Sequence, residues 1–146
     1  PHSTVGDALS AAARERRGTP AEWEATRTCG AAAPYYNGGV VLWRTSDASH
    51  RFFDAWHAEW RRFRGIDQFA LVRALMRSGR RVATLPPRFN TLSIELPNAA
   101  AAARAGVCVL HFCPHTQQSR MAEFVRELRY DVHLMTIKGG GGDGVV

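Results

Sequence analysis

The sequence predicts an α/β fold, a layered sheet with flanking helices. Short, continuously apolar runs typical of buried strands alternate along the chain with longer segments whose apolar residues recur at helical spacing. Pro, Gly and capping residues separate these segments. The 146 residues fit one domain, which we assign to residues 1–138, followed by a flexible glycine-rich tail at 139–146.

The first segments are helical. Residues 3–17 are rich in Ala and Arg and have helical propensity. Thr19-Pro20-Ala21-Glu22 combines a cap, a first-turn Pro and a Glu three residues after the cap, which predicts a short helix through about residue 27. We expect this stretch to decorate the surface.

Three runs are predicted to be strands. Residues 40–43 are continuously apolar, as expected for a strand covered on both faces, and residues 107–112 are again of the buried type. Residues 82–85 are the other predicted strand, which Pro86-Pro87 ends. In an open α/β sheet the ligand crevice lies at the carboxyl ends of the strands. Residues 99–104 are compatible with a helical turn or with a loose surface connection.

A longer helix is predicted to begin at a cap on Asp47. Its aromatic residues share an arc of about 100° on a helical projection, and its arginines lie outside that arc. A nucleic-acid stacking surface would place both types on one face, so we expect the aromatics to pack on the sheet. These aromatics are Phe52, Phe53, Trp56, Trp60 and Phe63.

Two further helices follow. Asp67 begins one that runs to about residue 78, where Gly79 ends it. Its predicted buried residues are Phe69, Leu71, Val72, Leu75 and Met76. Thr116 is a predicted cap for the last helix, whose apolar residues follow helical spacing. Those residues are Met121, Phe124, Val125 and Leu128.

The net charge of +6 comes almost entirely from arginine, since Lys138 is the single lysine. Abundant Arg and Ala are typical of GC-rich codon usage, so most of the arginines are expected to be solvated surface. The alternative is attraction to anionic ligands. The three cysteines contain no C-x-x-C pair and are expected to be reduced thiols. No apolar run approaches the ~20 residues of a membrane span.

Four polar signatures occur in a fixed order along the chain. They are Asn37-Gly38-Gly39 before the first apolar run, Asp67-Gln68 at a helix start, Leu85-Pro86-Pro87-Arg88-Phe89-Asn90, and the run that ends in His111. Together they resemble the second half of a nucleotide-sugar-dependent glycosyltransferase of the GT-A fold, over roughly residues 34–116. The resemblance implies the acceptor-side half of such a domain, with the N-terminal half missing. The chain begins at Pro1 rather than Met, in keeping with this expectation.

The resemblance also implies roles for the residues before the two central helices. Asn37, Gly38 and Gly39 would bind substrate, since Gly permits close approach of backbone to ligand and Asn both donates and accepts hydrogen bonds. Asp67 would be catalytic, as a general base or as a positioning group, with Gln68 binding substrate and fixing the orientation of the carboxylate. The structural alternatives are a plain turn at Asn37 and a helix-dipole interaction at Asp67.

The same resemblance implies roles for two later residues. Asn90 would face the substrate, although its amide also suits a local Asx-turn. His111 would be a ligand of Mn²⁺ or Mg²⁺, with a structural role as the alternative. The Asp-x-Asp motif that supplies the other metal ligands in this family is absent from the chain, and Phe112-Cys113-Pro114-His115 replaces the family's diphosphate-binding G-x-K-P-W segment.

A structural zinc site is a rival hypothesis for the same region. Its ligands would be Cys108, His111, Cys113 and His115. Alternate residues of a strand are about 7 Å apart, so such a site would require the chain to fold back sharply at Pro114.

The resemblance therefore implies a metal-assisted glycosyltransferase that moves a sugar from a nucleoside diphosphate donor to a hydroxyl acceptor. Asn37, Asp67, Asn90 and His111 are expected to converge on one concave face. The 146-residue chain alone is expected to bind donors weakly and to transfer nothing. No nucleic-acid partner is expected, and the compartment would be the cytoplasm in a bacterium or the Golgi lumen in a eukaryote. The alternative function is a non-enzymatic, Arg-rich α/β module that binds an anionic partner.

Overall fold

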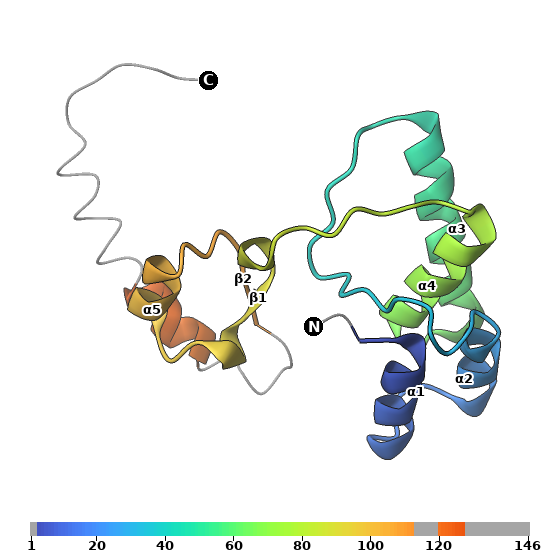
Figure 1. The fold of residues 1–146 in the computed structure, drawn as a ribbon, viewed down its shortest axis with the longest axis horizontal. Coiled ribbons are helices and arrows are strands. Elements are labelled where there is room, and N and C mark those ends of the chain that lie inside the picture. The colour runs from blue at the N-terminus through green and yellow to red at the C-terminus, as the bar shows by residue number, and fades with distance from the viewer. Residues whose placement is uncertain (1–2, 113–119, 128–146) are drawn as a thin grey trace. The chain divides into compact units, whose positions relative to one another are not determined.

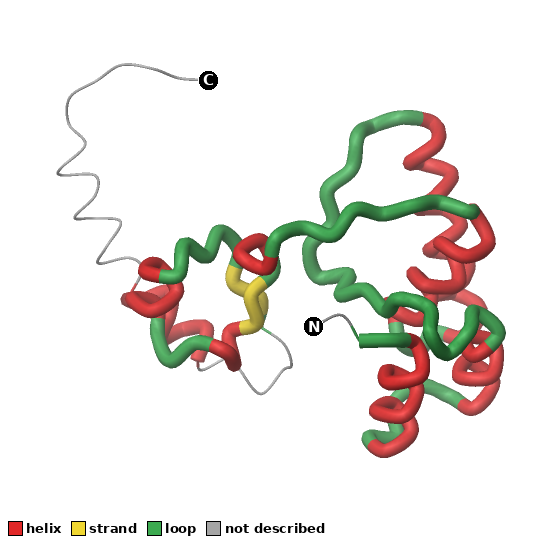
Figure 2. Tube along the Cα trace, viewed as in Figure 1, coloured by secondary structure: helices red, strands yellow, loops and turns green. Residues whose placement is uncertain are grey.

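Helices form most of the secondary structure in the computed structural model of this chain, which describes residues 3–112 and 120–127 (Figure 1). Within those residues the only sheet has two short parallel strands (Figure 2). The fold is therefore mixed α/β and mostly helical. The chain divides into two compact units, residues 1–83 and residues 84–146.

The first unit contains four helices, α1 (Val5–Arg14), α2 (Pro20–Arg27), α3 (Asp47–Phe63) and α4 (Asp67–Ser78). Thr4 and Thr19 cap α1 and α2 through their hydroxyl groups, and Pro20 is in the first turn of α2 as predicted. Ser46, not Asp47, caps α3, because the Ser46 hydroxyl accepts the Ser49 N–H. The residue after α4, Gly79, has φ +60°, the left-handed conformation that glycine adopts readily.

The core of the first unit lies between α1 and α4. Its buried residues are Val5, Leu9, Ala12, Phe69 and Val72. The α1 members are spaced i, i+4, i+7, which places them on one side of the helix. The prediction that the N-terminal stretch decorates the surface is therefore wrong: α1 supplies three of these five core residues.

The aromatic side of α3 packs on other helices and loops. Trp43 and Phe53 pack edge to face with ring centroids 4.9 Å apart, and Phe53 and Trp56 stack at 6.1 Å. The partner of α3 is α4. The predicted sheet beneath these aromatics is not there in the described residues, and their ring contacts are formed within α3 and with Trp43 of the preceding loop.

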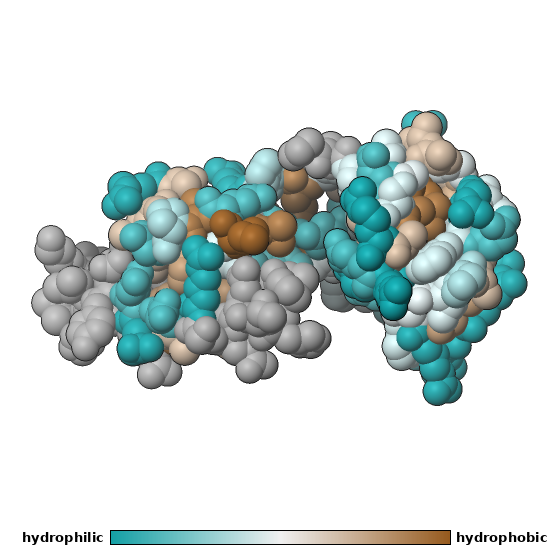
Figure 3. Space-filling model, turned by 90° about the horizontal axis from the view of Figure 1, so that it is seen from below, coloured by the Kyte–Doolittle hydropathy of each residue, from teal (hydrophilic) through white to brown (hydrophobic). Residues whose placement is uncertain are grey.

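Two of the three predicted strands are irregular in the structure. Residues 40–43 and 82–85 have no strand conformation, and the side chains of Leu42 and Trp43 are 72% and 58% exposed. Met76, predicted to be buried, is 56% exposed on α4. A short apolar run becomes a strand only when another backbone pairs with it, and no described segment does so here. Hydrophobic patches consequently reach the surface among hydrophilic residues (Figure 3).

The second unit is built around the parallel pair β1 (Thr91–Leu92) and β2 (Leu110–His111), with Thr91 opposite Leu110 and Leu92 opposite His111. The 3₁₀ turns η1 (Pro87–Phe89) and η2 (Ser93–Glu95) flank β1, and α5 (Ala99–Arg104) follows. The third predicted strand, residues 107–112, thus shortens to two residues. Residues 99–104, for which two conformations were open, are helical, with the Asn98 side chain as cap.

The second unit has a small hydrophobic core of its own. Ala99 and Ala102 of α5 are buried with Phe124, and the ring of Phe112 meets that of Phe124 edge to face at 5.5 Å. Residues 120–127 are helical, which agrees with the predicted last helix, although Met121 and Val125 are exposed. The predicted cap Thr116, Leu128 and the glycine-rich tail lie outside the described residues.

Cys29 and Cys108 are free thiols, as predicted, and Cys113 lies outside the described residues. Burial raises the pKa of the Cys29 thiol, which keeps it protonated. None of the helices in the described part of the chain is both long enough and apolar enough to cross a membrane.

Candidate functional site

The turn at Asn37-Gly38-Gly39 lies against the indole ring of Trp56 in α3. A Cβ atom built on Gly38 would lie 3.5 Å from Trp56 Cζ2 and 3.7 Å from Leu71 Cδ2, so the backbone passes directly over both side chains. Asn37 Oδ1 accepts the Gly39 N–H at 2.8 Å, which closes an Asx-type turn. The Asn37 side-chain oxygen thus holds the turn, while its amide nitrogen has no hydrogen-bond partner among the described residues.

The start of α4 meets the same indole ring. Trp56 Nε1 donates a hydrogen bond to the backbone oxygen of Asp67 at 3.0 Å. Trp56 therefore contacts both the Asn37-Gly38-Gly39 turn and the first residue of α4. Two of the four sequence signatures, distant along the chain, are neighbours in the first unit.

The Asp67 carboxylate is exposed at the N-terminus of α4. Its Oδ1 accepts the backbone N–H of Gln68 at 2.9 Å, and no other described residue forms a hydrogen bond with the carboxylate. The contact between Gln68 and Asp67 therefore uses the Gln68 backbone and not its side-chain amide, and the predicted substrate-binding role of Gln68 stays a prediction. The helix dipole and one backbone hydrogen bond stabilise the negative charge and leave Oδ2 open to a ligand.

Glu22 of α2 holds the turn that precedes Asp67. The Glu22 side chain is 1% exposed, and its two carboxylate oxygens accept the Ile66 N–H at 3.1 and 3.2 Å. Gly65 makes this contact possible, because a Cβ atom there would lie 2.0 Å from Glu22 Oε2. The backbone before Asp67 is therefore fixed from both sides, by Glu22 at Ile66 and by Trp56 at Asp67.

A buried ion network extends from Glu22 through Arg73 to α3. Arg73 Nε donates to Glu59 Oε2 at 2.9 Å, Arg73 Nη1 donates to Thr26 Oγ1 at 2.7 Å, and Nη1 lies 3.8 Å from Glu22 Oε1. Arg77 also pairs with Glu59. Buried charges are tolerated only when they are paired and hydrogen-bonded. Here the ion pairs and hydrogen bonds link α2, α3 and α4, the helix that begins at Asp67.

Tyr35 packs against the core of the first unit, and its ring meets that of Phe69 edge to face with ring centroids 5.7 Å apart. Burial raises the pKa of Tyr35 to about 12; the charge of Arg17 opposes the shift, and the carboxylates of Asp67 and Glu22 add to it. The phenol is therefore neutral at physiological pH.

In the second unit, Asn90 and His111 are paired. Asn90 directly precedes β1, His111 is in β2, and Asn90 Oδ1 lies 3.0 Å from His111 Nδ1. An oxygen acceptor requires a proton on Nδ1, and in that neutral tautomer the lone pair is on Nε2. The Asn90 side chain thus contacts His111 rather than closing the Asx-turn that was its structural alternative.

The predicted site residues form two groups. Asn37, Gly38, Gly39, Asp67 and Gln68 belong to the first unit, and Asn90 and His111 to the second. Within each unit the structure brings them together, and convergence of both groups on one face stays a prediction.

Sequence reasoning missed Trp56 and Glu22 as parts of this arrangement. Trp56 was assigned to packing on a sheet, and its contact with Asp67 leaves no local signal in the sequence. Glu22 was recognised as the Glu of a capping box. Its N–H does donate to Thr19 Oγ1, at 3.2 Å, but its carboxylate bonds to Ile66 instead of returning to Thr19.

No group of three His, Cys, Asp or Glu side chains in the part of the chain that the structure describes could hold a metal ion. Of the four residues in the zinc hypothesis, Cys113 and His115 lie outside that part. His111 by itself offers one nitrogen ligand. A comparison of the chain with protein-family models, curated proteins and solved structures finds no match.

Proposed function

We propose that this chain is the acceptor-side part of a GT-A glycosyltransferase, which transfers a sugar from a nucleoside diphosphate to a hydroxyl acceptor. The observation that carries the proposal is the meeting of Asn37-Gly38-Gly39 and Asp67 on Trp56. In the resembling family, the matching residues belong to the substrate site, and here they are neighbours although they come from separate segments.

Asp67 has the features of a group that receives a hydroxyl. One carboxylate oxygen is held by the Gln68 N–H, and the other has no partner among the described residues. In the transfer, the acceptor oxygen bonds to the anomeric carbon, and the bond from that carbon to the diphosphate breaks with its electron pair. The hydroxyl proton passes to Asp67 or, where Asp67 only orients the hydroxyl, to the departing diphosphate. Glu22 and Trp56 keep the backbone in place during this step.

Asn37 and His111 have complementary roles in the proposal. The free amide nitrogen of Asn37 donates to sugar hydroxyl groups. The hydrogen bond from His111 Nδ1 to Asn90 is the arrangement usual for a histidine that binds a metal through Nε2. Mn²⁺ or Mg²⁺ would neutralise the leaving diphosphate when bound, and its remaining ligands would come from outside the described residues.

The test compares Asp67→Asn with Asp47→Asn in the full-length gene product. Asp47 is a matched control, since it too is the first residue of an exposed helix start. Release of nucleoside diphosphate from a panel of nucleotide sugars, with Mn²⁺ present and water as surrogate acceptor, measures turnover. Asp67→Asn should lower the rate by about 10²–10⁴-fold, whereas Asp47→Asn should leave it unchanged.

Thermal unfolding of both variants separates chemistry from folding. Each substitution should change stability by less than about 1 kcal/mol, because Asn also suits a helix start. Equal turnover in the two variants would remove Asp67 from the site. Absence of release with every nucleotide sugar would reject transfer and favour the second candidate, a binding module for an anionic partner. Arg80 and Arg81 support that candidate, since neither pairs with a described residue.

A further inference from the structure

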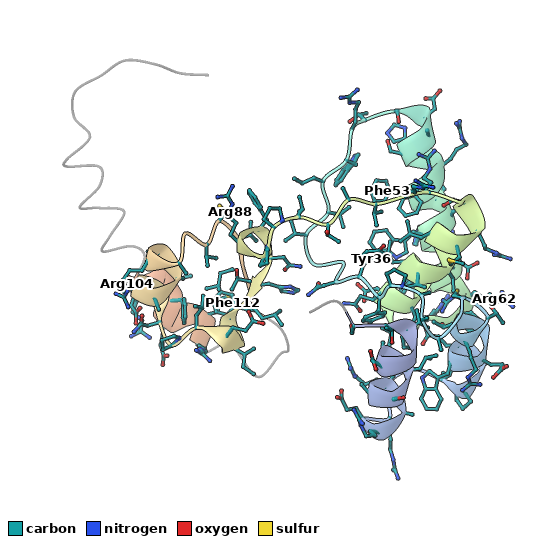
Figure 4. All side chains as sticks on the ribbon, viewed as in Figure 1. Tyr36, Phe53, Arg62, Arg88, Arg104 and Phe112 are labelled. Carbon is teal, nitrogen blue, oxygen red and sulfur yellow. The ribbon has the colours of Figure 1, made fainter. Side chains whose placement is uncertain are left out.

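A pocket of about 430 Å³ lies in the first unit, away from the Asp67 carboxylate. Three segments form it: residues 33–36, the second half of α4, and residues 79–82. Figure 4 shows Tyr36 beside α4. Its volume falls within the range of small-molecule sites, roughly 300–1,000 Å³.

One wall of the pocket is apolar. Val72 and Leu75 are core residues of α4 whose outer surfaces reach the pocket, and Pro34 faces it from the opposite segment. Met76 extends the wall and is 56% exposed. Methionine is flexible and polarisable, so it adapts to the shape of an apolar ligand.

The other wall carries two positive charges. Arg80 and Arg81 directly follow the left-handed Gly79, and both line the pocket. Neither forms an ion pair or a hydrogen bond with any described residue, and the lining contains no Asp or Glu. In the same helical region, Arg73 pairs with Glu59 and lies 3.8 Å from Glu22, and Arg77 also pairs with Glu59. The charges of Arg80 and Arg81 therefore remain available.

We propose that this pocket binds a small aromatic anion: a ring system that bears a phosphate, sulfonate or carboxylate group. The rings lie between Met76 and Tyr36, where apolar and edge-to-face contacts favour an aromatic body. The anionic group is held by Arg80 and Arg81, whose planar guanidinium groups match oxyanions in bidentate geometry. This site does not rest on glycosyl transfer, because Asn37 and Asp67 take no part in it.

Two fluorescent probes that differ by one charge test the proposal. The first is 8-anilinonaphthalene-1-sulfonate, and the second is N-phenyl-1-naphthylamine, the same ring system without the sulfonate. The sulfonate probe should bind at one site per chain and more tightly than the neutral probe. The double substitution Arg80→Gln/Arg81→Gln should weaken sulfonate binding by about tenfold or more, through loss of charge-assisted hydrogen bonds, and leave the neutral probe unaffected.

The matched control is Arg61→Gln/Arg62→Gln, which removes the same charge from neighbouring exposed positions of α3. It should leave both affinities unchanged. Met76→Ser should weaken both probes, since it shortens the shared apolar wall. Equal weakening by the two arginine pairs would show general electrostatic attraction and overturn the proposal. Equal affinity of the two probes, unaffected by Arg80→Gln/Arg81→Gln, would also overturn it.

Discussion

The Glu22 carboxylate accepts the backbone N–H of Ile66 at 3.1 Å, across 44 residues of chain. This bond attaches α2 to the turn that begins α4 and therefore to the backbone of Asp67. A buried carboxylate needs hydrogen-bond donors and a cation in place of water, and here Ile66 and Arg73 supply them. The geometry before Asp67 thus depends on a helix far away in sequence.

We expect Glu22→Gln to destabilise the first unit by about 2–3 kcal/mol, because an amide offers a poorer acceptor to Ile66 and removes one negative charge beside Arg73. Urea unfolding followed by tryptophan fluorescence measures this unit alone, since all four tryptophans lie in residues 1–83. Glu24→Gln is the control in the same helix. Glu24 pairs with Arg27 at the surface, so its loss should cost under about 1 kcal/mol. Equal losses of stability in the two variants would contradict the conclusion that the buried Glu22 carboxylate stabilises the turn at Ile66.

Substitution by alanine should affect stability differently at Gly65 and at Gly38. A Cβ atom on Gly65 would lie 2.0 Å from Glu22 Oε2, so Gly65→Ala must displace the carboxylate or the turn. We expect a loss of more than about 2 kcal/mol from the disrupted buried network. Gly38→Ala places its methyl group at ordinary contact distance from Trp56, 3.5 Å, and should change stability by less than about 1 kcal/mol. A lower urea midpoint for Gly38→Ala than for Gly65→Ala would contradict the packing of the two turns seen in the structure.

The raised pKa of Tyr35 predicts that the folded chain loses stability at alkaline pH. Its pKa is raised from 10.0 to about 12 in the folded chain, so the unfolded chain releases the phenol proton first as the pH rises. The stabilisation is fully present below pH 10.0 and is lost progressively up to about pH 12. Tyr35→Phe keeps the ring contact with Phe69 and should flatten this part of the pH profile, measured by urea unfolding. An unchanged slope in the variant would assign the loss to other groups.

The Asn90–His111 pair predicts a single tautomer. Nitrogen NMR of His111 at alkaline pH, assigned by loss of its signal in His111→Gln, should show the proton on Nδ1. Asn90→Ala should remove this preference, whereas Asn98→Ala, which deletes the cap of α5 in the same unit, should keep it. A proton on Nε2 in the unchanged protein would exclude the proposed metal-binding orientation.

The sequence by itself determined where α2 and α4 begin and end. Thr19 with Pro20 marks the start of α2, Asp67 the first residue of α4, and Gly79 its end. These signals are local: a cap, a fixed φ or a left-handed residue acts within one helical turn, so neighbouring residues suffice to predict it. The choice of Asn90 and His111 as candidates was likewise possible from their places beside apolar runs, although their mutual contact was not part of that prediction.

Tertiary structure decided which apolar runs pair and which polar groups meet. Residues 40–43 and 107–112 look alike as sequence, yet only the second run supplies a strand, because Leu110 and His111 find a partner in Thr91 and Leu92. Backbone hydrogen bonds between distant segments depend on the whole fold. The same reason applies to the site: Glu22 satisfies its buried charge with Ile66 and Arg73, and Trp56 its indole N–H with Asp67, partners that no local pattern specifies.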